Sequence, residues 1–249
     1  MEKALHLSNL AIEYDCMVLC ISELGHRRTI PGWTCIASTD TFTQSGIFVR
    51  NGFKATKLEH SALSIHCARI AGECITFNTT GLTQVIVIHT YIPPEVSYTD
   101  RRHYGANISR FAASYPSHAI MLTGDLNTRS VLFDPNEDPT RHSYLDESLN
   151  QLPWNVITDG SPTRLDHCLD ITLVNDTGLR HIIHWQALNE AISDHLPCLT
   201  SSSLKVWHNT KGLHQKPFQI TNMTKTIDNV VDWINKRSQR QDPLTLEDI

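Results

Sequence analysis

The amino-acid sequence predicts a mixed α/β fold. Three observations support this prediction. The composition is that of an ordinary globular protein, with 40% apolar and 19% charged residues; segments with helical spacing alternate with β-branched apolar runs; and polar side chains stand at the ends of several of those runs. The 249 residues are enough for one large domain or two small ones.

The N-terminal third predicts one helix followed by strands. Leucines at helical spacing in residues 2–14 predict a helix that packs one face inward. The apolar run CMVLCISE that follows predicts a buried strand ending at Glu23. Short strand-like pieces separated by Gly and Asn then predict an antiparallel meander, at residues 45–50, 62–70 and 73–78.

The middle of the chain predicts strands and helices in alternation. Residues 84–95 form a continuous β-branched run, typical of a central strand, which Pro93 and Pro94 stop. Residues 98–115 have helical spacing, and the apolar run before Gly124 predicts the next strand. The remaining elements expected are one helix and two strands, at residues 142–152, 169–174 and 181–188.

The composition changes near residue 204, so we expect a compact domain over residues 1–203. Residues 204–249 are polar, which predicts a linker with one short amphipathic helix at 224–236. The formal net charge of −5 argues against a broad nucleic-acid-binding coat, although a local basic groove is compatible with it.

The cysteine pattern and the hydropathy of the sequence indicate the cellular environment of the protein. The seven cysteines form no CxxC pair, and several stand in apolar runs, which favours reduced core thiols and a nuclear or cytoplasmic protein over a zinc site. We see no signal-peptide pattern, and no apolar run reaches the roughly 20 residues that a membrane span needs. No membrane partner is expected.

Polar side chains stand where the expected strands end. Asp125 and Asn127 follow a buried run two positions apart, so they face the same side, and Gly124 permits a close approach of the backbone or of a ligand. Strand ends that share one edge of a sheet would bring further polar groups into the same cleft. These groups are Glu23, Tyr91, Asp170 (with Asp166 as a rival), Asp194 and His195.

Each of these residues alone has a structural interpretation: Gly, Asp and Asn dominate turns for local reasons, and a single histidine is more often structural than catalytic. Together, carboxylates, an amide, a histidine and a tyrosine are the groups that metal-assisted phosphodiester hydrolysis requires. Carboxylates suit Mg²⁺, which points to Glu23 and Asp194 as ligands.

The same chemistry suggests the remaining roles. Asp125 would polarise the attacking water, with Asn127 orienting it. His195, bonded to Asp170, would stay cationic and donate to a phosphate oxygen, as would the Tyr91 hydroxyl.

The order of the motifs resembles that of the endonuclease/exonuclease/phosphatase superfamily. The resemblance covers about residues 5–200 and is nearest to the apurinic/apyrimidinic-type endonuclease domain of non-LTR retrotransposons. The motifs are ISE (21–23), YIPP (91–94), GDLN (124–127), LDITLV (169–174) and SDHLP (193–197).

The resemblance implies a four-layer, two-sheet α/β sandwich (DNase I-like). It also implies Mg²⁺-dependent nicking of duplex DNA, with Mn²⁺ as an alternative metal and abasic sites as candidate targets. The 3′-hydroxyl would prime a reverse transcriptase, fused in a longer protein or acting alongside.

Position by position, the resemblance gives the roles stated above to Glu23, Tyr91, Asp125, Asn127, Asp170, Asp194 and His195. Three cations near these motifs are candidates for contacting DNA or phosphate: Arg101, Arg102 and Arg129.

One departure from the family pattern is expected to matter. The family begins with a strand carrying an active-site Asn, whereas the present chain opens with the helix predicted over residues 2–14. We therefore expect the fold to lack the first strand, which would leave an unpaired sheet position and one missing ligand.

Two alternatives remain open. The same fold serves phosphatases acting on inositol phosphates or lipid headgroups, for which Arg101 and Arg102 would supply a basic pocket. The chain would otherwise be a catalytically inactive retroelement remnant or a binding module that retains the fold.

Overall fold

The computed structural model describes residues 2–22, 29–38, 45–59, 63, 71–77, 84–134, 137, 147, 154–190, 193–203, 205–207 and 215–217. Glu23 lies outside the described residues. So do the helix expected at 224–236, all of the 142–152 helix except Glu147, and all of the 62–70 strand except Leu63.

In the described part of the chain, strands outnumber helices. The first half contains α1 (Glu2–Glu13), β1 (Val18–Ile21), β2 (Trp33–Ser38), β3 (Gly46–Arg50), β4 (Thr56–Lys57), β5 (Ala71–Phe77), β6 (Val85–Tyr91), α2 (Tyr98–Ala113) and β7 (Ala119–Asp125). The second half contains β8 (Trp154–Val156), β9 (Asp170–Asn175), α4 (Asp176–Leu179), β10 (Ile182–Ala187), β11 (Cys198–Ser202), β12 (Lys205–Trp207) and β13 (Gln215–Pro217).

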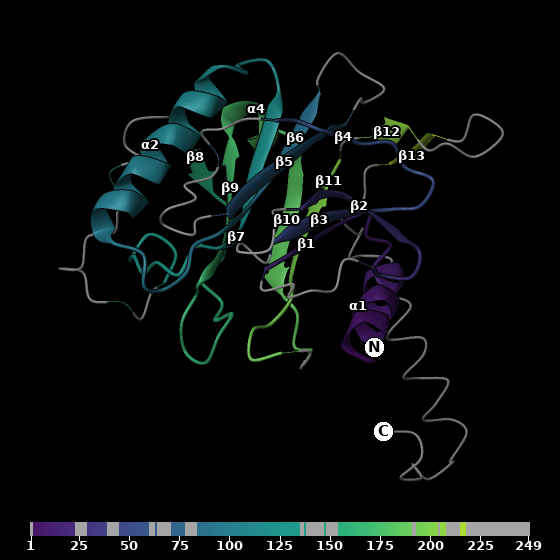
Figure 1. Ribbon diagram of the computed structural model, residues 1–249, viewed down its shortest axis with the longest axis horizontal. Coiled ribbons are helices and arrows are strands. Elements are labelled where there is room, and N and C mark those ends of the chain that lie inside the picture. Colours follow the sequence, from purple (N-terminus) through teal and green to yellow (C-terminus); the bar gives the residue numbers. More distant parts are fainter. Residues whose placement is uncertain are drawn as a thin grey trace, which may run out of the picture.

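The largest sheet has six strands in the order β4-β5-β6-β7-β9-β8. Its pairings are antiparallel except for the parallel pair of β6 and β7, which α2 connects. Separate smaller sheets are formed by β1-β3-β2, by β10-β11 and by β12-β13. Figure 1 shows α2 covering the outer face of the large sheet and α1 lying beside the three-stranded sheet.

Strand β6 is buried on both faces, as predicted for a central strand. Val85 and Val87 belong to the core between the sheets, whereas Ile86 and Ile88 belong to the core beneath α2. This double burial explains why β6 is a continuous apolar run rather than an alternating one. The layers therefore follow the order helix, sheet, sheet, helix (Figure 1).

Helix α2 begins where its sequence provides a cap. The Oγ atom of Ser97 accepts a hydrogen bond from the Asp100 backbone N–H at 3.1 Å, satisfying one of the unpaired donors of the first turn. The buried face of the helix carries Tyr104, Ile108 and Phe111, which pack on the large sheet. The helix expected over 98–115 is confirmed to within two residues.

Several expectations about strands are wrong or incomplete. The single meander is wrong, because β3 pairs with β1 and β2 whereas β5 belongs to the six-stranded sheet. β2 and β8 were not expected, and β8 has three residues, too few to show a period. The short pair β12 and β13 lies in the tail expected to be a linker.

An open position separates two of the smaller sheets. In the described part of the chain, the ladder of β1 is with β3 alone and that of β11 is with β10 alone. A cavity of about 580 Å³ is lined by β1, the segment 193–200, Val87, His89 and Met121. Although β1 has the apolar sequence VLCI, all four of its residues are only partly buried, as expected for an unpaired sheet position.

None of the helices in the described ranges combines the length and the hydropathy needed to cross a membrane.

Candidate active site

Adjacent strands of the large sheet bring the expected polar residues to one edge. In the antiparallel ladder of β7 and β9, Asp125 stands directly opposite Asp170. β6 runs parallel to β7 and ends at Tyr91, which is partly buried. Asp125 and Asp170 line the cavity described above together with Asp194 and His195.

Asn127 holds the carboxylate of Asp125. The backbone N–H of Asn127 donates to Asp125 Oδ1 at 3.0 Å, and its Nδ2 donates to Asp125 Oδ2 at 3.2 Å and to the Ile92 carbonyl at 3.0 Å. Asn127 adopts φ 42°, a left-handed conformation that Asn tolerates better than most residues. Asp125 is 3% exposed, so these donors offset part of the cost of burying its charge.

Gly124 is required by the packing of β7 against β6. Its φ is +149°, and a Cβ atom at this position would lie 1.9 Å from the Thr90 carbonyl oxygen. The expectation that glycine permits a close approach of the backbone here is confirmed.

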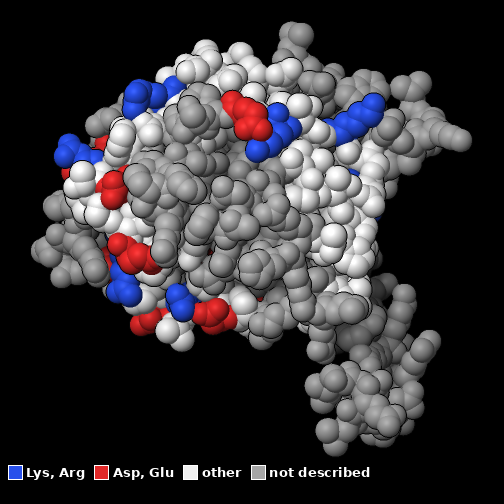
Figure 2. All heavy atoms as spheres, viewed as in Figure 1, with Lys and Arg blue, Asp and Glu red and all other residues white. Residues whose placement is uncertain are grey.

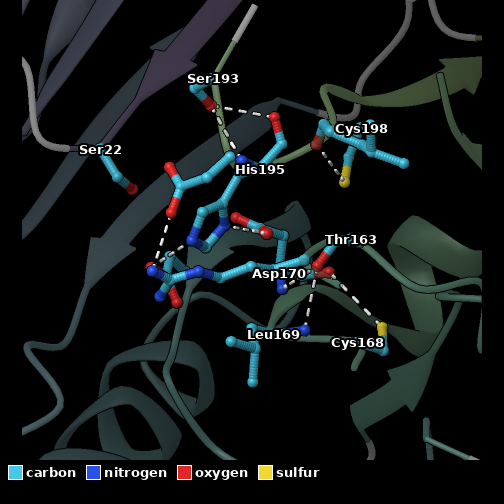
Figure 3. A network of polar contacts seen from close by, with 12 residues as sticks. Ser22, Thr163, Cys168, Leu169, Asp170, Ser193, His195 and Cys198 are labelled. Atoms are coloured by element: carbon cyan, nitrogen blue, oxygen red, sulfur yellow. Dashed lines mark hydrogen bonds and ion pairs between the residues drawn. The ribbon is translucent and has the colours of Figure 1, made fainter. Parts of the chain in front are cut away.

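His195 lies between two carboxylates. Its Nδ1 is 2.8 Å from Asp170 Oδ2, and its Nε2 is 3.9 Å from Asp125 Oδ2. Figure 3 shows the Asp170 side chain pointing at the imidazole, with Thr163 beside it. The hydrogen bond to Asp170 raises the pKa of His195 and outweighs the opposing effect of burial.

Thr163 ties together the segments that carry this pair. Its Oγ1 accepts hydrogen bonds from the backbone N–H groups of Leu169 and Asp170, both at 3.0 Å. Its carbonyl accepts from the backbone N–H of Leu196 at 2.7 Å. No role was predicted for Thr163 from the sequence, where it stands in the PT pair that precedes LDITLV.

The rival of Asp170 points elsewhere. Asp166 has a 79% exposed side chain and lies 3.3 Å from His167 Nε2. Asp194, next to His195, is 67% exposed and forms an ion pair with Arg164 at 2.8 Å. The structure therefore places Asp170 rather than Asp166 against His195, and Asp194 at the solvent side of the site.

The two carboxylates of the site fit a divalent cation that prefers oxygen ligands. Asp125, Asp170 and His195 each offer a ligand atom, and these atoms lie within 4.8 Å of one another. The sequence reasoning missed a second group with this spacing, which consists of Asp134, Glu137 and His167.

The three candidate phosphate-binding arginines have different surroundings. Arg101 is 8% exposed, and its guanidinium donates to backbone carbonyls. The predicted phosphate-binding role of Arg101 is therefore wrong, because the donors are already used inside the protein. Arg102 is 62% exposed and pairs with Glu147 at 2.7 Å, while Arg129 is 39% exposed and lies 3.8 Å from Glu137.

Charges of both signs lie close together around the rim of the face in Figure 2, where the described residues form no broad basic surface. This mixture agrees with the net charge of −5.

His89 is a further residue that the sequence reasoning missed. It is 2% exposed, its Nδ1 lies 3.1 Å from the Thr123 carbonyl oxygen, and its Nε2 lies 3.5 Å from Ser22 Oγ. His89 thus connects the large sheet to the end of β1 at the wall of the cavity. The signal in the sequence was the polar His89 inside the otherwise apolar run VIVIHTY.

One sequence family and several solved structures are similar to this protein. Residues 85–199 match the sequence family described as "Endonuclease-reverse transcriptase". A search of curated proteins found no significant match.

Solved structures share the fold. The endonuclease domain of TRAS1, a telomere-specific non-LTR retrotransposon, superposes with a TM-score of 0.61 at 18% identity, covering 77% of this chain and 88% of that one. TDP2 from D. rerio, complexed with a single-strand DNA product, gives 0.57 at 11% identity over 78% and 88% of the two chains. A mannosyl-6-phosphatase from Bacteroides thetaiotaomicron gives 0.56 at 11% identity over 79% and 89%.

The two-sheet architecture is thus the DNase I-like fold that the sequence motifs predicted. The match of residues 85–199 to that sequence family and the shared fold agree with the resemblance to the endonuclease/exonuclease/phosphatase superfamily that the motifs carry.

Proposed function

We propose that this protein is a metal-dependent endonuclease that nicks duplex DNA and leaves a 3′-hydroxyl end. The observation that carries the proposal is His195, held by Asp170 at Nδ1 and facing the Asp125 carboxylate with Nε2. The likeness to a retrotransposon endonuclease domain and the name of the matching family support DNA as the substrate.

The residues have distinct parts in this proposal. Asp170 accepts a hydrogen bond from the Nδ1–H group of His195, and the raised pKa favours the imidazolium form. The Nε2–H of that imidazolium then donates to a non-bridging phosphate oxygen, where negative charge grows during hydrolysis. Asp125, fixed by Asn127, accepts a proton from the attacking water, and Tyr91 adds a phenolic donor to the phosphate.

Carboxylates would hold the metal: Asp194 and Glu23 are the ligands predicted from the sequence, and Asp125 and Asp170 offer carboxylate oxygens within 4.8 Å of each other. A bound Mg²⁺ or Mn²⁺ would offset the charge that develops on the phosphate oxygens and the leaving group. Arg102 and Arg129, both partly exposed, would contact the DNA backbone.

Plasmid nicking tests the proposal. Purified protein should convert supercoiled DNA to the nicked form with Mg²⁺ or Mn²⁺ and stop when EDTA is added. Asp194→Ala and His195→Ala should each lower the rate on the order of a hundredfold or more. Asp176→Ala is the matched control, since Asp176 is an exposed acid at the other end of β9 and should leave the rate unchanged. Equal nicking by all variants would indicate a contaminating nuclease and overturn the proposal.

The cleaved end and the target follow from the same assay. A DNA polymerase should extend the nick directly, as expected for a 3′-hydroxyl that primes a reverse transcriptase. Duplexes with and without one abasic site measure the preference for such sites. A nick that requires phosphatase treatment before extension would contradict the predicted polarity of cleavage.

The second candidate function is phosphatase activity. The structural likeness to a mannosyl-6-phosphatase supports it, and Arg102 and Arg129 would face the additional phosphates. Release of phosphate from soluble inositol phosphates or sugar phosphates, without plasmid nicking, would favour this candidate. A folded protein inactive on both substrate classes would favour the inactive remnant.

A further inference from the structure

Arg101 joins two turns that carry residues of the candidate site. It lies in the first turn of α2, and its side chain is almost fully buried. All five N–H groups of its guanidinium donate to backbone carbonyls. Nε donates to Val96 at 2.9 Å, Nη1 to Leu126 at 3.0 Å and Asn127 at 2.8 Å, and Nη2 to Pro93 at 2.8 Å and Pro94 at 3.0 Å.

These carbonyls belong to the turns that follow β6 and β7. The first turn begins directly after Tyr91, and the second contains Asn127. The two turns also contact each other, since the Ile92 N–H donates to the Asp125 carbonyl at 3.0 Å and Asn127 Nδ2 donates to the Ile92 carbonyl at 3.0 Å. Arg101 therefore fixes the relative position of the proposed phosphate donor and the proposed water-activating carboxylate.

One peptide group connects Arg101 with Asp125. The Leu126 carbonyl accepts a hydrogen bond from Arg101 Nη1 at 3.0 Å, and the N–H of the same peptide, that of Asn127, donates to Asp125 Oδ1 at 3.0 Å. Hydrogen bonds in series polarise one another, so the positive charge of Arg101 strengthens the donor that holds the Asp125 carboxylate.

We propose that Arg101 is a positioning residue for the hydrolytic site, acting through the backbone of the two turns without touching the substrate. The inference rests on the proposed function for its kinetic consequence. A lysine cannot replace Arg101, because an ammonium has three donors and lacks the planar fork that reaches five carbonyls.

The test compares Arg101→Lys and Arg101→Ala with Arg110→Ala in the plasmid-nicking assay. Arg110 is an exposed arginine on the same helix that bonds only within α2 in the contacts resolved for it, so it is the matched control. Both Arg101 variants should lose on the order of a hundredfold in kcat with KM for DNA changed less than about threefold, because misplaced reacting groups slow the chemistry. Arg110→Ala should keep the wild-type kcat.

Chemical rescue separates positioning from general loss of structure. Methylguanidinium at non-denaturing concentration should restore part of the kcat of Arg101→Ala, and methylammonium should not. The wild type and Arg110→Ala should respond to neither. A folded Arg101→Lys variant with a kcat within twofold of the wild type would overturn the proposal, as would rescue by methylammonium alone.

Hydrogen exchange gives a readout independent of activity. In Arg101→Lys, the amides of residues 90–97 and 122–130 should exchange faster than in the wild type, whereas those of β3 should not change. If the wild-type protein nicks no DNA, the proposed function is wrong. The hydrogen-exchange measurement still tests whether Arg101 holds the two turns in place. Unchanged exchange in both segments would overturn the positioning role.

Discussion

The Nδ1 atom of His195 lies 2.8 Å from the Oδ2 atom of Asp170, although the two residues stand 25 positions apart. On its other side, the imidazole faces Asp125, which stands opposite Asp170 in the ladder of β7 and β9. The register of β7 against β9 and the segment 193–195 thus bring the carboxylates of Asp170 and Asp125 to either side of the His195 imidazole. This arrangement suits a site where a proton donor and a proton acceptor act on the same phosphate.

Asp170→Asn should lower the nicking rate while leaving the fold intact. The amide would still occupy the space beside His195 but would no longer favour its charged form, so we expect a loss on the order of a hundredfold. The pKa of wild-type His195 is raised, so activity that depends on the imidazolium falls only as pH rises through this raised value. In Asp170→Asn this alkaline decline should move to lower pH.

The measurement is a pH–rate profile of plasmid nicking for the wild type and Asp170→Asn. Asp176→Asn serves as the control and should keep the wild-type profile. An unchanged rate and an unchanged alkaline decline in Asp170→Asn would remove Asp170 from the mechanism.

Gly124→Ala should destabilise the protein strongly. The new Cβ would lie 1.9 Å from the Thr90 carbonyl oxygen, and φ at this position is +149°, so β7 and β6 would have to move apart. We expect a loss of about 3 kcal/mol or more in the free energy of unfolding, from overpacking and backbone strain together. Urea unfolding followed by circular dichroism measures it.

Gly32→Ala is the matched control for steric contact. Gly32 has a φ of +81°, but a Cβ there would have no neighbour within 4 Å. Its cost should therefore be limited to the left-handed conformation, about 1–2 kcal/mol. If the two substitutions cost the same, the contact with Thr90 does not explain the requirement for glycine in GDLN.

His89 should make the protein less stable as pH falls below neutrality. Burial lowers the pKa of His89, although its hydrogen bonds to the Thr123 and Ile21 backbone oppose this shift. In the unfolded chain, His89 takes up a proton at its ordinary pKa, whereas in the folded protein it does so only at a lower pH. The contribution of His89 to the free energy of unfolding is therefore fully present above pH 6.5. It is lost as pH falls towards the lower pKa of the folded state, with a slope of at most about 1.4 kcal/mol per pH unit.

Urea unfolding of the wild type, His89→Gln and His184→Gln between pH 5 and 7.5 measures this slope. His184 is an exposed histidine on β10 and should leave the pH dependence as in the wild type. His89→Gln should flatten it. A wild-type curve with no decline over this range would contradict the prediction.

The outer edge of β1 should exchange its amide hydrogens readily. In the described residues β1 pairs with β3 on one side only, whereas β7 pairs with both β6 and β9. Amides of β1 that face away from β3 should therefore exchange much faster than any amide of β7, because they lack a ladder partner. Hydrogen exchange followed by NMR resolves single amides, and full protection along β1 would show that its edge is covered.

The sequence by itself determined the elements with strong periodicity and the types of the polar residues. The double-sided burial of β6 was visible because β-branched residues run without interruption from Val85 to Ile88. Asp125 and Asn127 were recognisable because the period of a strand places alternate residues on one side. Both properties are local, so no knowledge of distant contacts was needed.

Only the tertiary structure decided which polar groups meet. Asp166 was a rival of the predicted Asp170 in the sequence, and the register of β9 against β7 placed Asp170 beside His195 and left Asp166 in solvent. Arg101 looked like a phosphate ligand, yet α2 packs so that its guanidinium is buried among the carbonyls of two turns. Burial and hydrogen-bond partners depend on packing between segments far apart in the chain, which a local pattern does not encode.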